Sequence, residues 1–287
     1  MPISAGLYYS SHNEGSDGRK PVVLIHDAAS SHQAWPPEIR RLPGQSVYTL
    51  DLPGHGNSEG IGFQSIEAYC ESVLTFMASL NLYQTVLVGH GMGAAIALTL
   101  ALDFPQHVAG LGLISGGSFL KLPDTLLDYL SSASTRPVGM QMLERMLVSP
   151  ASSSRDTARG INILRGTRPG VLYGDWKAYA QFDLSARLET LHMPAYVVCG
   201  QNDRLTPPGQ SRHLTQVLTN ARLEIIPDAG HLLLLEQPHN LALSLSAFLM
   251  DLETWYQSYP LPVAFPTHTQ TPADPVDKPK DRPAAHR

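Results

Sequence analysis

A short glycine-rich turn stands where a nucleophilic side chain is expected. The segment Gly89-His90-Gly91-Met92-Gly93 follows an apolar run at 85–89 and leads directly into a second apolar run. A strand, a sharp turn and a helix in succession form the setting of the G-x-S-x-G motif, in which a serine hydroxyl attacks a carbonyl carbon. Gly91 takes the central position and has no hydroxyl. Loss of such a nucleophile lowers turnover by a factor on the order of 10⁶, so ordinary acyl-enzyme catalysis is not expected.

Two further residues, Asp203 and His231, complete the candidate site. Asp203 lies in the segment 200–207 and His231 in the segment 228–231, each after an apolar strand-like run. Taken singly, such an aspartate can cap a turn and such a histidine can belong to an ordinary loop. In chain order, they follow Gly91 as the acid and the histidine of a triad follow their serine. We therefore assign Gly91 to the nucleophile position, Asp203 to the acid and His231 to the base.

The elements that must position these residues alternate along the chain. Short apolar or β-branched runs alternate with helical patterns from residue 21 to about residue 250, which predicts a mostly parallel, doubly wound sheet with helices on both faces. An antiparallel edge strand is expected near residues 7–9. The other predicted strands are 22–26, 47–51, 85–89, 111–114, 195–199 and 223–226. Residues 66–80 predict a helix with one apolar face, and 94–102 a helix buried on all sides.

The strand pattern disappears between residues 116 and 188. Helical stretches there are interrupted at 151–154 and 168–170, and they carry Met140, Met142, Met146, Tyr173, Trp176 and Tyr179. This pattern predicts a helical cap over the carboxyl edge of the sheet, where open α/β folds bind ligands. The apolar side chains imply an apolar ceiling for the pocket.

One domain is expected over residues 1–258. Its core comprises 1–115 and 189–258, with the cap at about 116–188, and the last helix begins near Pro238. Residues 259–287 are rich in proline and poor in large apolar side chains, which predicts a disordered tail.

The sequence resembles the α/β-hydrolase superfamily over roughly residues 20–250, in particular its esterase, lactonase and carbon–carbon hydrolase branch. The usual turn of that branch reads G-H-S-M-G where this chain has G-H-G-M-G. Residues 51–58 match the D-x-P-G-x-G-x-S loop of the family, and the segments around Asp203 and His231 are similar to its G-x-x-D and G-H segments. The family's oxyanion-loop strand usually ends in His-Gly, whereas here it ends in His26-Asp27.

This resemblance implies an α/β-hydrolase fold with a helical cap and a Ser-His-Asp triad that lacks its serine. It also implies that the backbone N–H groups of Ala28 and Met92 form an oxyanion hole. His26, Asp27, His90 and Trp176 are then expected at the substrate pocket.

None of the neighbouring residues is a clear replacement for the nucleophile. His90 stands where the family commonly has histidine and is interpreted as a packing residue. Ser115 ends a strand but lacks the sharp turn. Asp27 is interpreted as a surface or loop-capping residue in preference to a catalytic carboxylate. No metal is expected, because no metal-binding spacing occurs among His12, His32, His55, His192, His213 and His239. No organic cofactor is expected either.

The charge balance argues against a nucleic-acid partner. The chain has 287 residues with 20 Lys and Arg against 25 Asp and Glu, a formal net charge of -5, so nucleic acid is not an expected partner.

The sequence offers no clear membrane segment. The first residues lack a cationic stretch followed by an apolar core, and the apolar run 94–102 is too short to span a bilayer. We expect a cytoplasmic protein with a small-molecule substrate or ligand and no membrane partner, and the oligomeric state stays open.

Three functions are compatible with a missing nucleophile. In the first, the chain is a carboxylesterase-like hydrolase of a small, mainly apolar ester, lactone or related substrate, and the serine is absent by alteration or by natural loss. In the second, His231 and Asp203 act as a non-covalent general base, poised near neutral pH, in water activation, carbon–carbon cleavage or lyase chemistry. In the third, the pocket binds a small molecule without turnover. Retention of the Asp203/His231 pair and of loop 51–58 favours chemistry over binding.

Overall fold

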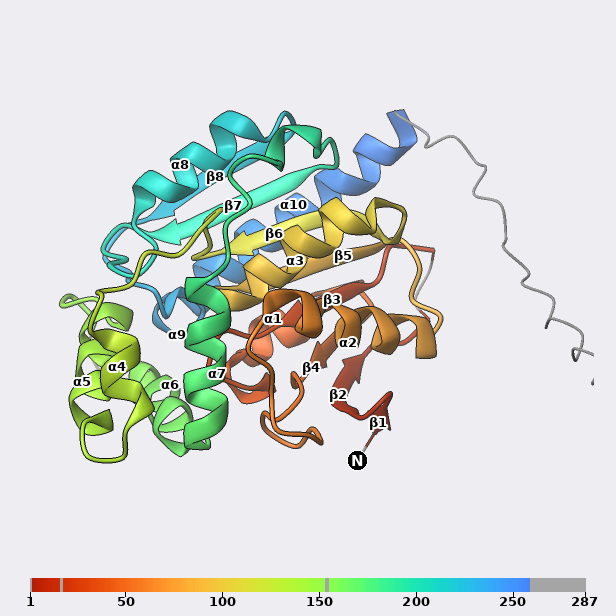
Figure 1. The fold of residues 1–287 in the computed structure, drawn as a ribbon. Coiled ribbons are helices and arrows are strands. Elements are labelled where there is room, and N and C mark those ends of the chain that lie inside the picture. The colour runs from red at the N-terminus through yellow and green to blue at the C-terminus, as the bar shows by residue number, and fades with distance from the viewer. Residues whose placement is uncertain (1, 16–17, 153–154, 259–287) are drawn as a thin grey trace, which may run out of the picture.

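A single twisted sheet organises the residues that the computed structural model describes, which are 2–15, 18–152 and 155–258 (Figure 1). The sheet has eight strands in the order β1-β2-β4-β3-β5-β6-β7-β8. The strands are β1 (Ile3–Ser4), β2 (Leu7–His12), β3 (Val22–Ile25), β4 (Val47–Leu50), β5 (Thr85–His90), β6 (Val108–Ile114), β7 (Ala195–Gly200) and β8 (Ala221–Ile226). β2 pairs antiparallel with β1 and β4, and all pairs from β4 to β8 are parallel. The predicted mostly parallel sheet with an antiparallel edge is confirmed.

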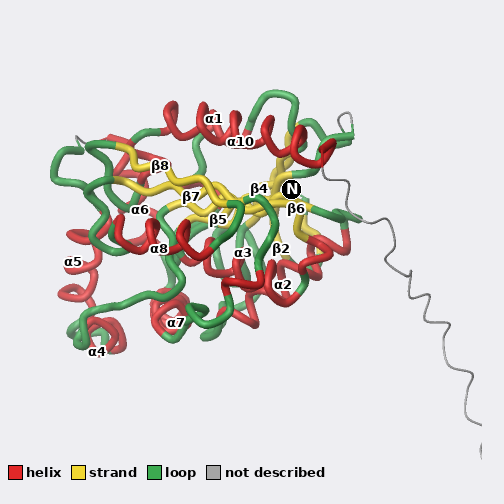
Figure 2. Tube along the Cα trace, turned by 90° about the horizontal axis from the view of Figure 1, so that it is seen from above, coloured by secondary structure: helices red, strands yellow, loops and turns green. Residues whose placement is uncertain are grey.

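Helices cover both faces of this sheet (Figure 2). α1 (Pro37–Arg40) and α10 (Pro238–Ser258) lie on one face, and α2 (Ile66–Ser79), α3 (Met92–Asp103) and α8 (Pro208–Val217) lie on the other. α9 (Leu233–Glu236) precedes α10, and single 3₁₀ turns occupy His32–Ala34, Pro105–His107 and Leu188–Thr190. This arrangement on two faces is the doubly wound architecture that the alternating pattern predicts.

α3 is the central helix of the fold. Its side chains are buried from Met92 to Ala101, as the apolar pattern predicts. Gly93 permits a close approach to β3, because a Cβ atom at this position would lie 2.1 Å from the carbonyl oxygen of Ile25. The start of α3 is thereby held against the carboxyl end of β3.

β2 and β6 each extend three residues beyond their predicted bounds, and β1 was not predicted. β6 begins at Val108 and not at residue 111, because Gly110 weakens the apolar pattern. Gly112 has a packing reason, since a Cβ atom there would lie 3.0 Å from a methyl group of Val88 on β5. Glycines thus weaken the apolar pattern that marks a strand in the sequence, and they allow close packing in the sheet.

Four helices separate β6 from β7. They are α4 (Leu126–Ser131), α5 (Arg136–Leu147), α6 (Arg155–Gly166) and α7 (Pro169–Ala180). In Figure 1 they gather at the end of the sheet toward which the parallel strands point. The predicted break at 168–170 marks the start of α7, because Pro169 takes the first helical position.

Two further sequence expectations concern the C-terminal tail and a membrane-spanning helix. The predicted disordered tail, 259–287, lies outside the described residues. Within the described part of the chain, no helix combines the length and the apolar character that a bilayer crossing requires.

Candidate active site

The turn at Gly91 joins β5 to α3 in a backbone conformation that suits glycine. Its φ is 52° and its ψ is -113°, and its N–H donates to the carbonyl oxygen of Ile114 at 3.0 Å. A residue with a Cβ atom is strained in such a conformation by about 1–3 kcal/mol. Glycine at this position therefore relieves strain in a turn that lies between two buried elements.

The Asp27 side chain fills the space beside this turn. Asp27 follows β3 by two residues, and its Oδ1 accepts hydrogen bonds from the N–H groups of Ala28 and Met92, both at 2.7 Å. Met92 is the first residue of α3, so the carboxylate also caps the positive end of a buried helix. The two N–H groups that the sequence assigns to an oxyanion hole are thus brought together on one carboxylate oxygen.

Asp27 and a side chain at position 91 exclude each other. A Cβ atom added to Gly91 would lie 2.0 Å from Oδ1 of Asp27 and 2.3 Å from its Cγ. Of the two interpretations of Asp27, a surface position is wrong, since the residue is 3% exposed, whereas a capping role agrees with the hydrogen bonds from Ala28 and Met92. The sequence could not show this, because the contact joins two loops that are 64 positions apart.

His231 lies between two carboxylates. Its Nδ1 is 2.9 Å from Oδ2 of Asp203, and its Nε2 is 3.1 Å from Oδ2 of Asp27. Asp203 is itself fixed by the N–H groups of Leu205 and Thr206, which donate to its Oδ1 at 2.9 Å each. The structure therefore brings the two predicted triad residues together and adds Asp27 on the remaining ring nitrogen of His231.

This arrangement determines the charge of His231. Burial alone would lower the pKa of His231, but Asp203 and Asp27 together raise it to about 10. Burial opposes ionisation of Asp27, yet its hydrogen bond to His231 keeps the pKa of its carboxyl below the ordinary value. The raised pKa favours an imidazolium between the two carboxylates at neutral pH. A histidine base poised near neutral pH therefore stays a prediction, which these contacts do not favour.

The predicted pocket residues His26 and His90 brace the loops of the site. His26 donates from Nδ1 to the carbonyl oxygen of Asp27 at 2.7 Å and accepts at Nε2 from the N–H of Leu52 at 3.0 Å. Burial and the nearby His55 lower the pKa of His26 to about 4, which agrees with a neutral ring. His90 donates from Nε2 to the carbonyl oxygen of His231 at 2.8 Å. Both rings contact backbone groups of the loops that carry Asp27 and His231. Their place in a substrate pocket stays a prediction.

Three polar groups near the carboxyl ends of the strands have no hydrogen-bond partner within the described protein. They are the indole N–H of Trp176, the phenol of Tyr179 and the hydroxyl of Ser115. All three side chains are buried. Burial, followed by the nearby carboxylates of Asp27 and Asp203, raises the pKa of Tyr179, so its hydroxyl stays protonated beside the cluster. Tyr179 was not assigned to the site from the sequence, although its place three residues after Trp176 on one helix was a usable signal.

α7 is tied to the core by a second buried carboxylate, which the sequence analysis missed. Asp175 accepts from the N–H of Ala29 at 2.7 Å, from Nε2 of His55 at 2.6 Å and from the hydroxyl of Tyr69 at 2.5 Å. Burial would lower the pKa of His55, but Asp175 raises it. These bonds fix α7, and with it Trp176 and Tyr179, against the loop that carries Asp27.

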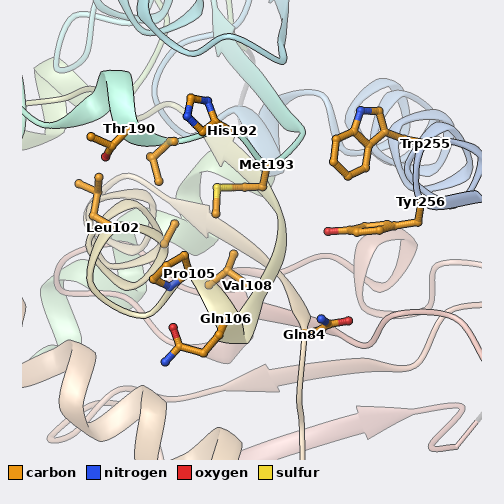
Figure 3. A pocket seen from close by; sticks show the side chains of 12 residues that line it. Gln84, Leu102, Pro105, Gln106, Val108, Thr190, His192, Met193, Trp255 and Tyr256 are labelled. Carbon is orange, nitrogen blue, oxygen red and sulfur yellow. The ribbon is translucent and has the colours of Figure 1, made fainter. Parts of the chain in front are cut away.

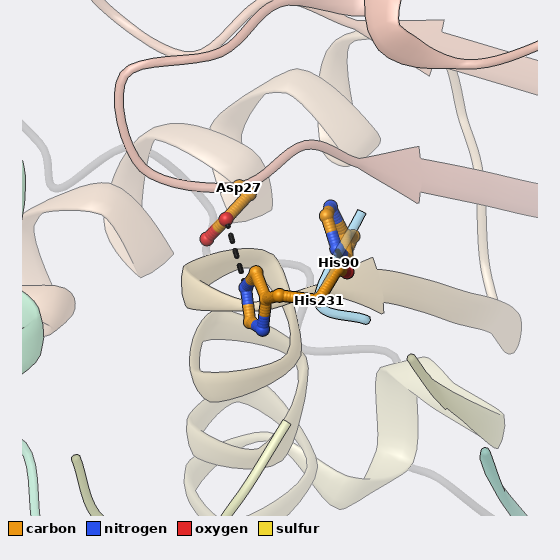
Figure 4. A group of neighbouring side chains, drawn as sticks. All are labelled: Asp27, His90 and His231. Atoms are coloured by element: carbon orange, nitrogen blue, oxygen red, sulfur yellow. Dashed lines mark hydrogen bonds and ion pairs between the residues drawn. The ribbon is translucent and has the colours of Figure 1, made fainter. Parts of the chain in front are cut away.

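The cluster also has the composition of a cation site. Among the described residues, Asp27, His90 and His231 each offer a ligand atom, and these atoms lie within 4.8 Å of one another (Figure 4). The three come from three distant segments, so sequence spacing could not reveal the group. In the structure, however, Asp27 and His231 face each other through the hydrogen bond drawn in Figure 4, which a cation on these atoms would have to replace.

An apolar cavity of about 450 Å³ lies elsewhere in the molecule (Figure 3). Gln84 and Val108 on its wall stand at the starts of β5 and β6, and Trp255 and Tyr256 of α10 close one side. The catalytic candidates stand at the opposite, carboxyl ends of the strands. This cavity is therefore separate from the cluster around His231.

Known proteins share this fold and sequence pattern. A family profile described as alpha/beta hydrolase fold matches residues 20–238. The pimeloyl-[acyl-carrier protein] methyl ester esterase of Nitrosomonas europaea is 28% identical over 238 residues, which cover 77% of this chain and 92% of that protein. A 2-hydroxy-6-oxononadienedioate/2-hydroxy-6-oxononatrienedioate hydrolase from a Pseudomonas species is 25% identical over 240 residues, covering 76% of this chain and 84% of that protein.

A solved structure shows the same fold. The enol-lactonase from Burkholderia xenovorans LB400 superimposes with a TM-score of 0.78 at 21% identity, covering 85% of this chain and 96% of the lactonase. The profile match extends over most of the chain and includes the turn at Gly91 and the loop of Asp203. This protein belongs to the α/β-hydrolase fold family.

Proposed function

We propose that the chain is a hydrolase of a small, mainly apolar molecule, working at the buried cluster around His231. The observation that carries the proposal is the chain of contacts Asp203–His231–Asp27, which ends on two converging N–H groups. In this proposal α4–α7 form the cap over the site, and Gly91 occupies the nucleophile position. The N–H groups of Ala28 and Met92 correspond to an oxyanion hole, which the Asp27 carboxylate fills in this structure.

Ordinary acyl-enzyme turnover is not expected from this site. Gly91 has no hydroxyl, and the Asp27 carboxylate already accepts the two N–H groups that a substrate oxyanion would need. Charge-assisted hydrogen bonds of this kind are about twice as strong as neutral ones, so a neutral ester carbonyl is a weak competitor for them. The imidazolium state of His231 likewise disfavours the non-covalent general-base hypothesis while Asp27 stays in place.

The two departures from the family pattern fit each other, which favours natural divergence over a laboratory alteration. A laboratory change of serine to glycine would alter position 91 alone. In this chain position 27 also differs from the family, since aspartate stands where glycine is usual. The carboxylate at position 27 fills the volume that a side chain at position 91 would need. We infer that Asp27 and Gly91 were acquired as a pair.

Reversal of this pair tests the proposal. The double variant Asp27→Gly, Gly91→Ser restores both family residues, and we expect it to hydrolyse p-nitrophenyl acetate or butyrate at least about 10³-fold faster than the parent chain. Gly91→Ser alone should stay inactive, because its Cβ atom would lie 2.0 Å from the Asp27 carboxylate. His231→Ala added to the double variant should abolish the gain. A folded double variant without esterase activity toward either ester would refute the proposed hydrolase site.

A further inference from the structure

The apolar cavity at the amino ends of β5 and β6 has the composition of a second binding site (Figure 3). We propose that it binds a small aliphatic monocarboxylate, with the hydrocarbon chain inside the cavity and the carboxylate at Lys20. The site lies at the opposite end of the strands from the cluster around His231. The inference goes beyond the proposed function and does not depend on it.

Segments that lie far apart in the chain build the walls of this cavity. Ala101 and Leu102 come from the end of α3, Val108 from the start of β6, Met193 from the loop before β7 and Trp255 from α10. The volume of about 450 Å³ lies in the range of small-molecule sites, which is about 300–1,000 Å³. Since these side chains are apolar, transfer of a hydrocarbon chain from water into the cavity is favourable.

Hydrogen bonds hold two of these walls in place. Nδ2 of Asn220 donates to the carbonyl oxygen of His192 at 2.6 Å, and the hydroxyl of Tyr256 donates to the carbonyl oxygen of Ala109 at 2.5 Å. His192 and Tyr256 both line the cavity. The first bond fixes the loop before β7, and the second fixes the end of α10 against β6. A ligand of a site that is already formed loses less free energy to ordering of the protein.

The ammonium group of Lys20 stands beside the wall that Gln84 and Tyr256 form. Its Nζ donates to Oε1 of Gln84 at 2.5 Å and lies 5.3 Å from the centre of the Tyr256 ring. Among the described residues, no carboxylate forms an ion pair with this ammonium. The carboxylate of Glu253 contacts the backbone N–H of Lys20, at 3.4 Å, and not the ammonium. A cation at the border of an apolar cavity favours a ligand with an anionic end.

Gln84 adds a second donor at the same border. Because its Oε1 accepts from Lys20, the N–H groups of its amide remain available to an acceptor. Its φ is 50°, in the left-handed region that few residues other than glycine adopt. Backbone outliers of this kind are frequent at ligand sites. A carboxylate has two oxygens, so it can accept from Lys20 and from Gln84 together.

Solvent reaches this cavity, whereas the cluster around His231 is closed off. Gln106, Thr190 and His192 line the cavity and are exposed, so a ligand can enter between them without opening of the fold. Asp27 and His231 are buried. The two places can therefore be tested separately in the same folded chain.

Methyl NMR of the methionine residues tests the location of the site. The full chain, with isotope-labelled methionine methyl groups, is titrated with sodium octanoate, and Met193→Leu assigns the signal of Met193. Met193 lines the cavity, whereas Met92 starts α3 beside Asp27. We expect a saturable shift of the Met193 signal and no shift of Met92. A shift of Met92 alone would place the acid at the His231 cluster, which overturns the inference and leaves the proposed function intact. No shift of Met193 at millimolar octanoate would also overturn it.

Affinities from the same titration separate the chain from the charge. Each buried methylene strengthens binding by about fourfold, so hexanoate should bind roughly tenfold more weakly than octanoate. Lys20→Gln keeps a donor for Gln84 but removes the charge, and it should raise the Kd of octanoate about fivefold while the Kd of 1-octanol changes by less than about twofold. Lys121→Gln, at an exposed lysine elsewhere, is the matched control and should change neither. Equal affinities of hexanoate and octanoate, or an octanoate Kd unchanged by Lys20→Gln, would overturn the inference.

Discussion

Two buried carboxylate–histidine systems lie in the same core, and they differ in their balance of charge. In the pair of Asp175 and His55, one carboxylate faces one histidine ring, and the other donors to Asp175 are the N–H of Ala29 and the hydroxyl of Tyr69. His55 donates its second ring proton to the carbonyl oxygen of Pro53 at 3.1 Å. All of these groups are satisfied, and the system ties α7 to the core.

The cluster around His231 carries one carboxylate more than its imidazolium can neutralise. Asp203 and Asp27 both face the ring, and Trp176 and Tyr179, whose donors find no hydrogen-bond partner in the described part of the chain, stand on the helix that Asp175 fixes. A buried system with matched charges is expected to serve stability, whereas surplus charge with strongly shifted pKa values is typical of a reactive site. Substitutions in the first system should therefore change stability, and substitutions in the second should change activity.

The largest effect is expected from the double variant Asp27→Gly, Gly91→Ser on ester hydrolysis. The change frees the N–H groups of Ala28 and Met92 from the Asp27 carboxylate and supplies the missing hydroxyl. Hydrolysis of p-nitrophenyl esters should rise by at least about 10³-fold, which corresponds to about 4 kcal/mol. Gly91→Ser with Asp27 kept is the control, because its Cβ atom would still meet the carboxylate. Equal activity of the two variants would show that Asp27 does not block the site.

Asp175→Asn should have the next largest effect, and on stability. Asp175 Oδ2 accepts from both the N–H of Ala29 and Nε2 of His55, whereas the oxygen or the amide N–H of an asparagine can pair with only one of them in the same way. The substitution therefore weakens at least one buried hydrogen bond. Loss of one partner of a buried charged pair costs about 3–5 kcal/mol, which urea unfolding would detect. Ser72→Ala, a change at a half-buried hydroxyl on α2, is a suitable control. Unchanged stability of Asp175→Asn would show that the matched pair is not structural.

Gly91→Ala isolates the steric coupling between the two loops. In the parent chain the added methyl group meets the Asp27 carboxylate, and the free energy of unfolding should fall by at least about 2 kcal/mol. In an Asp27→Gly background only the backbone strain of about 1–3 kcal/mol remains. A double-mutant cycle on thermal or urea unfolding measures the difference. Additive effects would show that the two positions do not compete for space.

The smallest effect, counted per pH unit, is expected in the pH dependence of stability. The pKa of His231 is raised from 6.5 to about 10, so its contribution is fully present below pH 6.5 and is lost as the pH rises through about 10. Between these values the free energy of unfolding should fall by roughly 1 kcal/mol per pH unit relative to a His231→Gln variant, which lacks this proton. Identical pH profiles for the parent and His231→Gln would contradict the imidazolium state.

Much of the site was visible in the sequence because it depends on local order. The turn at Gly91, the loop of Asp203 and the loop of His231 each follow a strand whose apolar pattern is clear. Parallel strands end at one edge of the sheet, so residues just after them must gather there. Strand bounds were less accurate where glycines replace apolar side chains, as in β6.

The role of Asp27 was not visible in the sequence. It depends on how close Asp27 lies to other residues in space, and not on its separation from them along the chain. Its neighbours in the sequence suggest a turn residue, and only the packing of β3 against α3 brings its carboxylate to the N–H of Met92. Asp175 was missed for the same reason, since its partners His55 and Tyr69 lie more than 100 positions earlier.

By itself, the sequence determined the fold class, the alternation of strands and helices, and the absence of a hydroxyl at position 91. These follow from apolar periodicity and residue type, which are local properties. Only the tertiary structure decided what occupies the vacated volume and which charge His231 carries. Those properties arise from burial and from contacts between loops that are far apart in the chain, where a displacement of a few ångströms separates a surface carboxylate from one that is buried against a helix end and a histidine.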